Sequence, residues 1–312
     1  MTNDLSLTNY FQQWIETYKK PAVSHVTYIK YQNTLQHTVT YFGNANLTKL
    51  TRLSYQRAIN NFAKTHAKRT TATFHKQIRA AILDAVEEGL IDYDFTRKVI
   101  ITGKEKTNQK AKFHSYIEWK SLIQYTEKNS IDSQNFIVYL SAMTGLRFAE
   151  VLGLTLEDVD VKNKIITINK SWDYKYHSGF KPTKNDSSIR RIDIDNRTIK
   201  VIKEIIRYRK LKQSNQRICI DDNGNLPVSA TINRHLEKIC KELGIPLISF
   251  HGLRHTHASI LLYKGVNILS VSKRLGHKDI TTTQSVYLHI IKEMEERETK
   301  LIMKIMTNAL SE

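Results

Sequence analysis

Residues 251–289 read HGLRHTHASILLYKGVNILSVSKRLGHKDITTTQSVYLH, and the spacing of their apolar residues is mostly that of helices. The H-x-x-R frame at the start places His251 and Arg254 one turn apart on the same helical face, so both side chains can contact one phosphate. His277 follows Gly276 at an expected helix end, and Tyr287 lies ten residues further on. Four groups that can bind or attack a phosphate therefore fall within one short stretch.

Two segments nearer the N-terminus extend this set. In TGLRFAE, residues 144–150, a glycine turn after a helix can direct Arg147 out of a packed wall, and Glu150 follows one helical turn later. In KPTKNDSSIR, residues 181–190, Lys184 occupies a polar turn between two expected strands, with Lys181 as the alternative lysine. Taken alone, Arg147 also fits an ordinary surface arginine, and Lys184 an ordinary lysine at a hairpin tip.

Together these side chains have the chemistry to break a phosphodiester without a metal ion. Arginine offers a fork of donors for two phosphate oxygens, lysine and histidine move protons, and tyrosine can be the covalent nucleophile. A zinc site is not expected, because His251, His255 and His257 cannot all face one ion and no acidic or cysteine ligand accompanies them. We expect His255 and His257 to be structural, and no metal or cofactor to be bound.

His277 and Tyr287 also have simpler explanations. A histidine at a helix C-terminus is favoured by the helix dipole, and a tyrosine at helical spacing from Val271 and Leu275 could belong to the core. Composition does not single out Tyr287, since the chain has 15 tyrosines. Its distance from His277 and its TTxxxY frame do, whereas Tyr263 is a poorer candidate because its surroundings are apolar.

These segments resemble the signature of the tyrosine recombinases, the phage integrase family, in the order and spacing of six residues. The six are Arg147, Lys184, His251, Arg254, His277 and Tyr287. The resemblance implies that they are catalytic, that Tyr287 forms a 3′-phosphotyrosyl link, and that Lys184 protonates the leaving 5′ oxygen. His251 is placed to accept the phenol proton, and Glu150 is similar to an acidic residue that supports the site in the family.

Residues 1–100 are expected to be helical. Apolar residues from Leu7 to Tyr18 share one helical face, and further helices are expected from Ser24 to Gly43, from about Ser54, and up to Gly89. Four amphipathic helices of this length make a small bundle. The bundle is similar to the SAM-like core-binding domain that precedes the catalytic domain in the family. Residues 101–112 are polar and lysine-rich, and we expect them to be a linker that lets two domains close around DNA.

Residues 113–312 are expected to form an α+β catalytic domain, so that the whole chain is mainly α with one small antiparallel β-sheet. Helices are expected at about 116–127, 135–143, 196–211 and 229–244, and strands near 175–182 and 189–194. The final segment, residues 290–312, reads as a charged helix. It either packs on its own domain or, by family resemblance, docks on a neighbouring protomer.

Net charge is +18, and both parts of the chain are basic. Residues 1–110 carry sixteen Lys and Arg against eight Asp and Glu, and the remainder carries thirty-two against twenty-two. Nucleic acid is the better partner than an anionic membrane, because no basic amphipathic helix with a large apolar face stands apart from a core. The residues expected to contact DNA phosphates from the bundle are Lys30, Lys64, Lys68, Arg69, Lys76 and Arg79.

The expected function is that of a site-specific tyrosine recombinase, the integrase of a phage or mobile genetic element. By resemblance it acts on double-stranded DNA at core-type sites, as a homotetramer on DNA and a monomer when free, with accessory DNA-bending or directionality proteins. Lacking a signal peptide or a long apolar run, it is expected in the bacterial cytoplasm, at the nucleoid when bound. The alternatives are a transposon recombinase, a chromosome-dimer resolvase, a type IB topoisomerase, or a non-catalytic DNA-binding protein.

Overall fold

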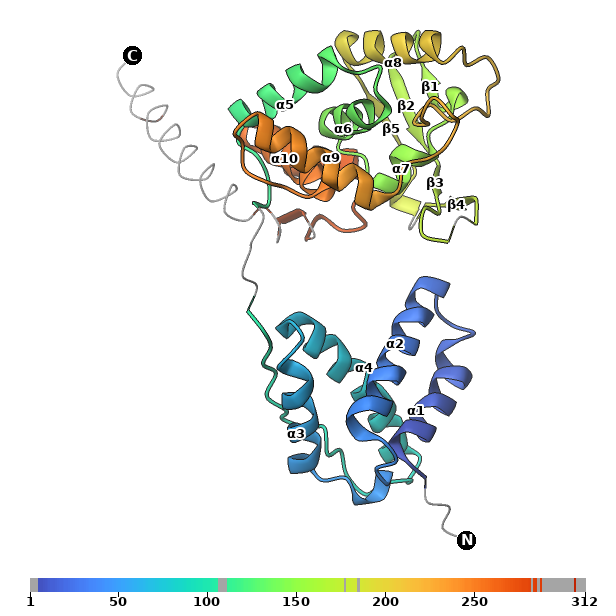
Figure 1. Ribbon diagram of the computed structural model, residues 1–312, viewed down its shortest axis with the longest axis vertical. Helices are drawn as coiled ribbons and strands as arrows, with labels where there is room; N and C mark the ends of the chain where they lie inside the picture. Colours follow the sequence, from blue (N-terminus) through green and yellow to red (C-terminus); the bar gives the residue numbers. More distant parts are fainter. Residues whose placement is uncertain are drawn as a thin grey trace. The chain divides into compact units, whose positions relative to one another are not determined.

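The computed structural model describes residues 5–105, 111–176, 178–183, 186–281, 283–284, 287 and 306. Contacts divide the chain into two compact units, residues 1–109 and 110–312, each with its own apolar core (Figure 1). Helices dominate both units, and the strands are short and antiparallel. The fold class expected from the sequence, mainly α with a small antiparallel sheet, is confirmed.

The N-terminal unit is a helical bundle. Its helices are α1 (Leu7–Trp14), which continues as a π-helical turn (Ile15–Lys19), α2 (His25–Phe42), α3 (Arg52–Ala63) and α4 (Lys68–Glu87). The sequence signals for their ends are local ones. Ser6 accepts a hydrogen bond from the backbone of Asn9 at the start of α1, and Gly43 ends α2 at a positive φ of 54°.

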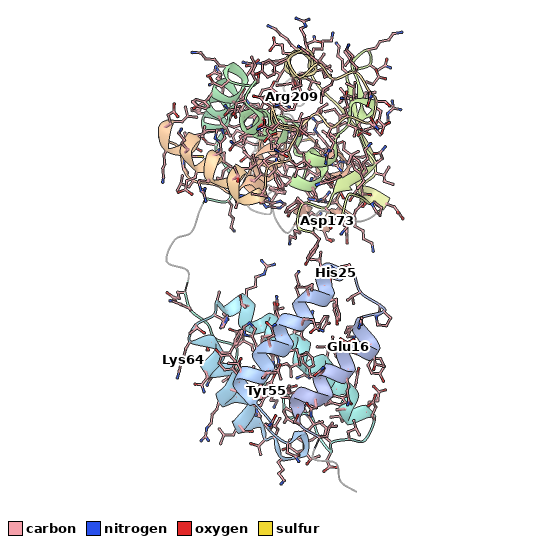
Figure 2. The ribbon with its side chains drawn as sticks, turned by 45° about the vertical axis from the view of Figure 1, so that its right-hand side comes forward. Glu16, His25, Tyr55, Lys64, Asp173 and Arg209 are labelled. Carbon is pink, nitrogen blue, oxygen red and sulfur yellow. The ribbon has the colours of Figure 1, made fainter. Side chains whose placement is uncertain are left out.

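The core of this unit is rich in aromatic rings. Phe62 of α3 stacks on Phe74 of α4 with 4.3 Å between ring centroids, and Phe42 of α2 stacks on Tyr55 of α3 at 5.4 Å. Figure 2 shows Tyr55 inside the unit and Lys64 at its surface. Residues 101–105, expected as linker, lie against the first turn of α4, where Lys104 donates its backbone N–H to His66 at 2.8 Å.

The C-terminal unit is built around α6 (Ser133–Thr144), which is buried on nearly every side. It contacts α5 (Tyr116–Lys128), α7 (Phe148–Gly153), α9 (Ser229–Glu242) and α10 (Phe250–Tyr263), as Figure 1 shows. A helix that is apolar all round must be enclosed by other elements. The remaining helices are α8 (Asn196–Tyr208) and α11 (Ile268–Leu275). No helix in the described part of the chain has the length and apolar character that a bilayer crossing needs.

The strands pair differently from the hairpin that the sequence suggested around Lys184. A three-stranded sheet has the order β1-β2-β5, from β1 (Val159–Asp160), β2 (Ile165–Ile168) and β5 (Arg190–Asp193). A separate pair joins β3 (Lys170–Trp172) to β4 (Phe180–Pro182). The two strands that flank the 183–189 segment therefore belong to different sheets. The reason is that Ile166 and Ile192 lie opposite each other on the core face, which favours pairing β5 with β2.

Candidate active site

A tight turn presents Arg147. Helix α6 ends at Gly145, whose φ of 71° is left-handed, and α7 starts with Arg147 as its N-cap residue. Only glycine fits this turn, because a Cβ atom on Gly145 would lie 2.8 Å from the His257 ring. The turn therefore fixes where Arg147 leaves the wall formed by α6, as the TGLRFAE pattern predicted.

Glu150 is a buried carboxylate between two guanidinium groups. Its Oε1 accepts from Nη1 of Arg147 at 2.7 Å and from Nη1 of Arg190 at 3.2 Å. Its Oε2 accepts from the backbone N–H of Arg147 and from Nη2 of Arg190, each at 2.9 Å. Burial raises the pKa of Glu150, but the hydrogen bonds and charges of Arg190 and Arg147 outweigh burial and lower it overall. The carboxylate is therefore ionised at neutral pH.

Three arginines converge on the C-terminal end of α11. Arg254 donates from Nη1 to the Gly145 carbonyl at 2.9 Å and from Nη2 to the Leu275 carbonyl at 2.6 Å. Arg147 donates to the carbonyl of Gly276 at 3.0 Å, and Arg190 to that of Arg274 at 2.7 Å. These carbonyls carry the negative end of the helix dipole, so they are good acceptors for cations.

Arg254 is the most enclosed of the three, with 2% of its surface exposed. Burial and the neighbouring charge of Arg147 lower the pKa of Arg254 to about 9, which still leaves the guanidinium positively charged at neutral pH. Arg147 is more open, with 30% of its side chain exposed. A phosphate arriving from solvent would therefore meet Arg147 before Arg254.

Two histidines lie on successive turns at the start of α10. His251 is exposed, and its ring lies 4.7 Å from that of His255, edge to face. Desolvation, then the charges of Arg254 and Arg147, lower the pKa of His251. The same kind of surroundings lower the pKa of His255 to about 4. Both rings are therefore neutral at pH 7, and a neutral imidazole can accept a proton.

His277 lies just beyond α11, after the left-handed Gly276. Its Nδ1 is 2.7 Å from Oγ1 of Thr283. Burial first, and then Arg254, Arg147 and Arg190, lower its pKa to about 4. His277 directly follows the Gly276 carbonyl that accepts from Arg147, so its ring lies beside the arginine cluster.

Tyr287 is buried against α10 and α11, with 2% of its surface exposed. Its ring packs with Ala258, Leu262, Val271 and Leu275. Its hydroxyl lies 2.9 Å from Nδ1 of His255. Burial raises the pKa of the phenol, and Arg254 opposes that rise. The described surface must therefore open before the hydroxyl can touch a DNA phosphate.

Lys184 lies outside the described residues. The rival lysine, Lys181, is engaged elsewhere, because its ammonium lies 2.6 Å from a carboxylate oxygen of Asp173 in the β3–β4 pair. Ser178 donates to the same carboxylate, and these contacts lower the pKa of Asp173. Asp173 therefore ties Lys181 to its own hairpin, which favours Lys184 as the lysine of the site.

The three histidines of HGLRHTHAS serve different contacts. His257 is buried, its Nδ1 faces the Ala142 carbonyl at 3.3 Å, and its Nε2 accepts from Nε of Arg274 at 3.0 Å. Burial, then Arg274, lower its pKa to about 3. His257 is thus structural, as the sequence predicted. His255, also expected to be structural, instead contacts Tyr287.

A pocket of about 360 Å³ opens beside Arg147 and His251. It lies between the first turns of α7, α9 and α10, and its wall includes the edge-to-face rings of Phe148, Tyr174 and Phe250. Asn233 and Ser229 of α9 supply polar groups. The pocket therefore adjoins the arginine cluster through Arg147.

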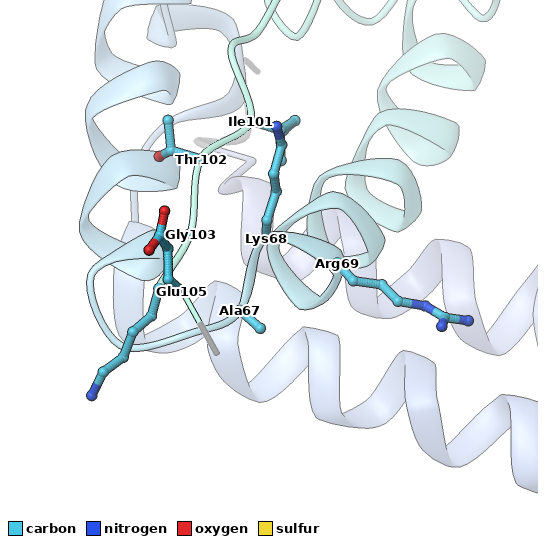
Figure 3. Close-up of a pocket in the computed structure, with 8 residues that line it drawn as sticks. Ala67, Lys68, Arg69, Ile101, Thr102, Gly103 and Glu105 are labelled. Carbon is cyan, nitrogen blue, oxygen red and sulfur yellow. The ribbon is translucent and has the colours of Figure 1, made fainter. Parts of the chain in front are cut away.

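In the N-terminal unit, the expected DNA contacts are Lys30, Lys64, Lys68, Arg69 and Lys76, all exposed. A second pocket, of about 690 Å³, is lined by the start of α4 and residues 101–105. Figure 3 shows Lys68 and Arg69 extending from α4 in different directions beside that segment. Arg79 differs from this group, since its guanidinium pairs with Asp94 at 3.0 Å and contacts the Thr96 carbonyl. We therefore leave Arg79 out of the proposed DNA surface.

Sequence reasoning missed two residues of this cluster, Arg190 and His255. Arg190 had a detectable signal, because alternation along β5 places it on the same face as the buried Ile192. A charged residue on the core face of a strand needs a partner, and Glu150 provides it. His255 had no comparable signal, since its contact depends on where Tyr287 packs.

Comparison with known proteins identifies the class. The family model described as the phage integrase family matches residues 115–294, and the model of its N-terminal SAM-like domain matches residues 6–63. The integrase of a Staphylococcus phage is 28% identical over 319 aligned positions, covering 93% of this chain and 90% of that protein. A XerC-like tyrosine recombinase of Caldanaerobacter subterraneus is 24% identical and covers 92% of this chain and 80% of its own.

Solved structures share the fold. The Tn1549 transposon integrase in complex with transposon right end DNA matches 95% of this chain and 100% of its own at a TM-score of 0.78 and 17% identity. The lambda integrase dimer bound to a core site matches 90% of this chain and 95% of its own, at a TM-score of 0.67 and 14% identity. The chain therefore belongs to the phage integrase family, whose members are site-specific tyrosine recombinases.

Proposed function

We propose that this recombinase is the integrase of a phage or other mobile genetic element, and that it cleaves DNA with Tyr287. The observation that carries the proposal is that Arg147, Arg254 and His277 gather at the end of α11, while the hydroxyl of Tyr287 lies 2.9 Å from His255, whose ring packs against that of His251. A phosphate-binding cluster beside a single phenol suits transesterification at phosphorus. The Staphylococcus phage integrase, which aligns along nearly the whole chain, supports the choice of element.

The proposed reaction exchanges one ester for another. The Tyr287 oxygen attacks the scissile phosphorus, an O–P bond forms, and the bond from phosphorus to the 5′ oxygen breaks. Once DNA binding has released the Tyr287 hydroxyl from His255, the phenol proton passes to the neutral ring of His251, and Lys184 supplies a proton to the departing 5′ oxygen. Each phosphodiester that is lost is replaced by a phosphotyrosyl ester, so rejoining needs neither ATP nor a divalent ion.

The arginines supply the charge that the reaction needs. In this structure Arg147 and Arg254 donate to backbone carbonyls at the end of α11. Phosphate oxygens are stronger acceptors because they are charged, so DNA binding can replace those carbonyl contacts. Both guanidiniums then stabilise the additional negative charge of the pentacovalent transition state, with His277 as a further donor.

We further propose the assembly and partners. The N-terminal unit supplies sequence-independent phosphate contacts on double-stranded DNA through its exposed lysines, the catalytic unit reads core-type sites, and residues 101–112 connect the two. The chain is a monomer when free and a homotetramer on DNA, with residues 290–312 docking in cis or on a neighbour. Accessory DNA-bending or directionality proteins determine whether integration or excision takes place. The reaction occurs on DNA in the bacterial cytoplasm.

A covalent-trapping experiment tests this function. On a nicked suicide substrate, the wild type should accumulate a protein–DNA adduct in EDTA, because no step of the scheme uses a metal. Tyr287→Phe should form no adduct while binding the same DNA. Tyr263→Phe is the matched control and should react normally, since Tyr263 is an exposed tyrosine of α10 outside the cluster. Adducts that persist in Tyr287→Phe would remove this residue from its role.

A transposon recombinase of the same chemistry is the second candidate. The Tn1549 integrase, whose fold matches this chain over almost its full length, was solved with transposon end DNA. Sequencing the DNA trapped in the wild-type adduct separates the two candidates. Adducts at the ends of a transposon would favour the second, and adducts at one attachment site of a phage would favour the first.

A further inference from the structure

The guanidinium of Arg190 makes more hydrogen bonds than those of Arg147 and Arg254. Its Nε donates to the Arg274 carbonyl at 2.7 Å, and its Nη1 to the Ser188 carbonyl at 2.9 Å. Nη1 and Nη2 together form a two-pronged contact with Glu150. Only 6% of its side chain is exposed. A buried arginine with this many partners is held in one position.

The partners of Arg190 belong to segments that carry proposed catalytic residues. Glu150 is in α7 and contacts Arg147 through both the backbone N–H and the guanidinium. Arg274 is at the end of α11, three residues before His277. A Cβ atom on Gly276 would lie 2.9 Å from Nη1 of Arg190, so the arginine also packs closely against that turn. Arg190 thus joins the start of α7 to the end of α11.

Glu150 depends on this contact. The carboxylate is buried, and half of its four hydrogen bonds come from Arg190. Without Arg190, the buried charge would be left with Arg147 alone. Arg147 would then be drawn toward Glu150, or Glu150 would take up a proton and release its hold on Arg147. Either change moves the guanidinium that meets the phosphate.

We propose that Arg190 is a positioning residue for the strand-cleavage step, acting on Arg147 through Glu150. It does not need to touch DNA itself, because its donors are taken up by protein acceptors. This inference rests on the proposed function, since it assigns Arg190 a role in the reaction proposed for Tyr287. It predicts a loss in the rate of cleavage without a matching loss in DNA affinity.

The test compares Arg190→Gln and Arg190→Lys with Arg191→Gln. Arg191 is the next residue of β5 and is exposed, so its variant removes the same charge outside the cluster. Adduct formation is measured at saturating protein, well below the unfolding temperature of each variant, beside the Kd for the same DNA. We expect both Arg190 variants to cleave roughly 10- to 100-fold more slowly, with Kd almost unchanged and Arg191→Gln like the wild type. Arg190→Lys should not restore the cleavage rate, because a single ammonium cannot replace the two-pronged contact of a guanidinium with Glu150.

Two further readouts distinguish positioning from a general loss of structure. If Arg190 acts through Glu150, then Glu150→Gln and Arg190→Gln combined should cleave no more slowly than the slower single variant. A substrate with a methylphosphonate at the scissile position lacks one charged oxygen. With this substrate, the difference in cleavage rate between Arg190→Gln and the wild type should become smaller. A purely structural defect would leave that difference unchanged and would overturn the proposal.

The controls keep this inference separate from the proposed function. A wild type that forms adducts, beside folded Arg190 variants that cleave at the wild-type rate, would overturn the role of Arg190 alone. Additive losses in the double variant, or full rescue by Arg190→Lys, would do the same. A wild type that forms no adduct at all would overturn the proposed function and this inference with it.

Discussion

At the scale of single residues, the cluster is prepared for a charged ligand. Arg147 and Arg254 already point at acceptors, but those acceptors are neutral backbone carbonyls of Gly276, Leu275 and Gly145. A phosphate oxygen is charged and is therefore a stronger acceptor for these arginines than a neutral carbonyl.

One buried and two half-buried histidines, His257, His255 and His277, make the stability of the catalytic unit depend on pH. The pKa of His257 is about 3, and those of His255 and His277 are about 4, against an ordinary value near 6.5. Between about pH 6.5 and pH 4 the unfolded chain binds protons that the folded chain does not. Acidification in this window therefore lowers the free energy of unfolding, by about 1.4 kcal/mol per pH unit for each such histidine.

Urea unfolding of the full chain at a series of pH values checks this expectation. The stability of the catalytic unit should be greatest above pH 7 and fall steadily toward pH 5. His257→Gln keeps a donor and an acceptor near Ala142 and Arg274 but cannot titrate, so its pH dependence should be shallower. A variant with the wild-type slope would show that His257 is not a source of the effect.

At the scale of elements, the α6–α7 turn sets the geometry of the site. Gly145 and Gly265 both have positive φ, at 71° and 86°, but only Gly145 is crowded by neighbouring side chains. A Cβ atom at Gly145 would meet the ring of His257 and a methyl group of Leu275, at 2.8 and 3.0 Å. Comparing alanine substitutions at these two glycines therefore separates the cost of backbone strain from the cost of steric overlap.

We expect Gly265→Ala to cost about 1 kcal/mol of stability, because only the left-handed backbone opposes it. Gly145→Ala should cost about 2–4 kcal/mol, because overpacking is added to the same backbone term. It should also slow cleavage, since Arg147 follows the turn by two residues. Equal losses in the two variants, measured by urea unfolding, would show that the contact with His257 relaxes easily.

The sequence predicted helices better than strands, for a physical reason. Helix ends depend on residues close in the chain, so Ser24 and Gly43 marked α2 correctly, and Gly145 marked the end of α6. Strand pairing depends on distant residues, so β5 was expected beside β4 but pairs with β2. Motif spacing predicted Arg147, His251, Arg254, His277 and Tyr287 as site residues, and their catalytic roles stay a prediction, whereas the contacts of Arg190 and His255 arise only from packing between elements.

At the scale of the whole molecule, the net charge of +18 governs how the chain meets DNA. Both units are basic, so affinity should fall steeply as salt rises, through release of counterions from the phosphates. This part of binding is independent of sequence. Specific sites must then be chosen by a smaller number of contacts within the grooves.

Lys68→Ala and Arg69→Ala should each weaken binding to any DNA and reduce the slope of log K against log salt by about 1. Both side chains are exposed at the start of α4. Lys20→Ala is the control in the same unit, because the Lys20 ammonium already lies 2.5 Å from Glu16. Binding isotherms over a range of salt concentrations give the slopes. A slope that changes as much in the control would assign the effect to net charge alone.

The crowding of arginines around the end of α11 has a practical consequence for handling the protein. The cluster contains three guanidiniums and one carboxylate, and only two of the guanidiniums contact that carboxylate, so it carries an excess of positive charge even before any substrate arrives. Small oxyanions should occupy it. Sulfate or inorganic phosphate should raise the melting temperature above that in chloride at equal ionic strength, and Arg147→Gln should abolish the gain. Sulfate or phosphate ions in a buffer would then compete with DNA for the arginine cluster. Cleavage rates measured in such a buffer would be lower than those measured in chloride.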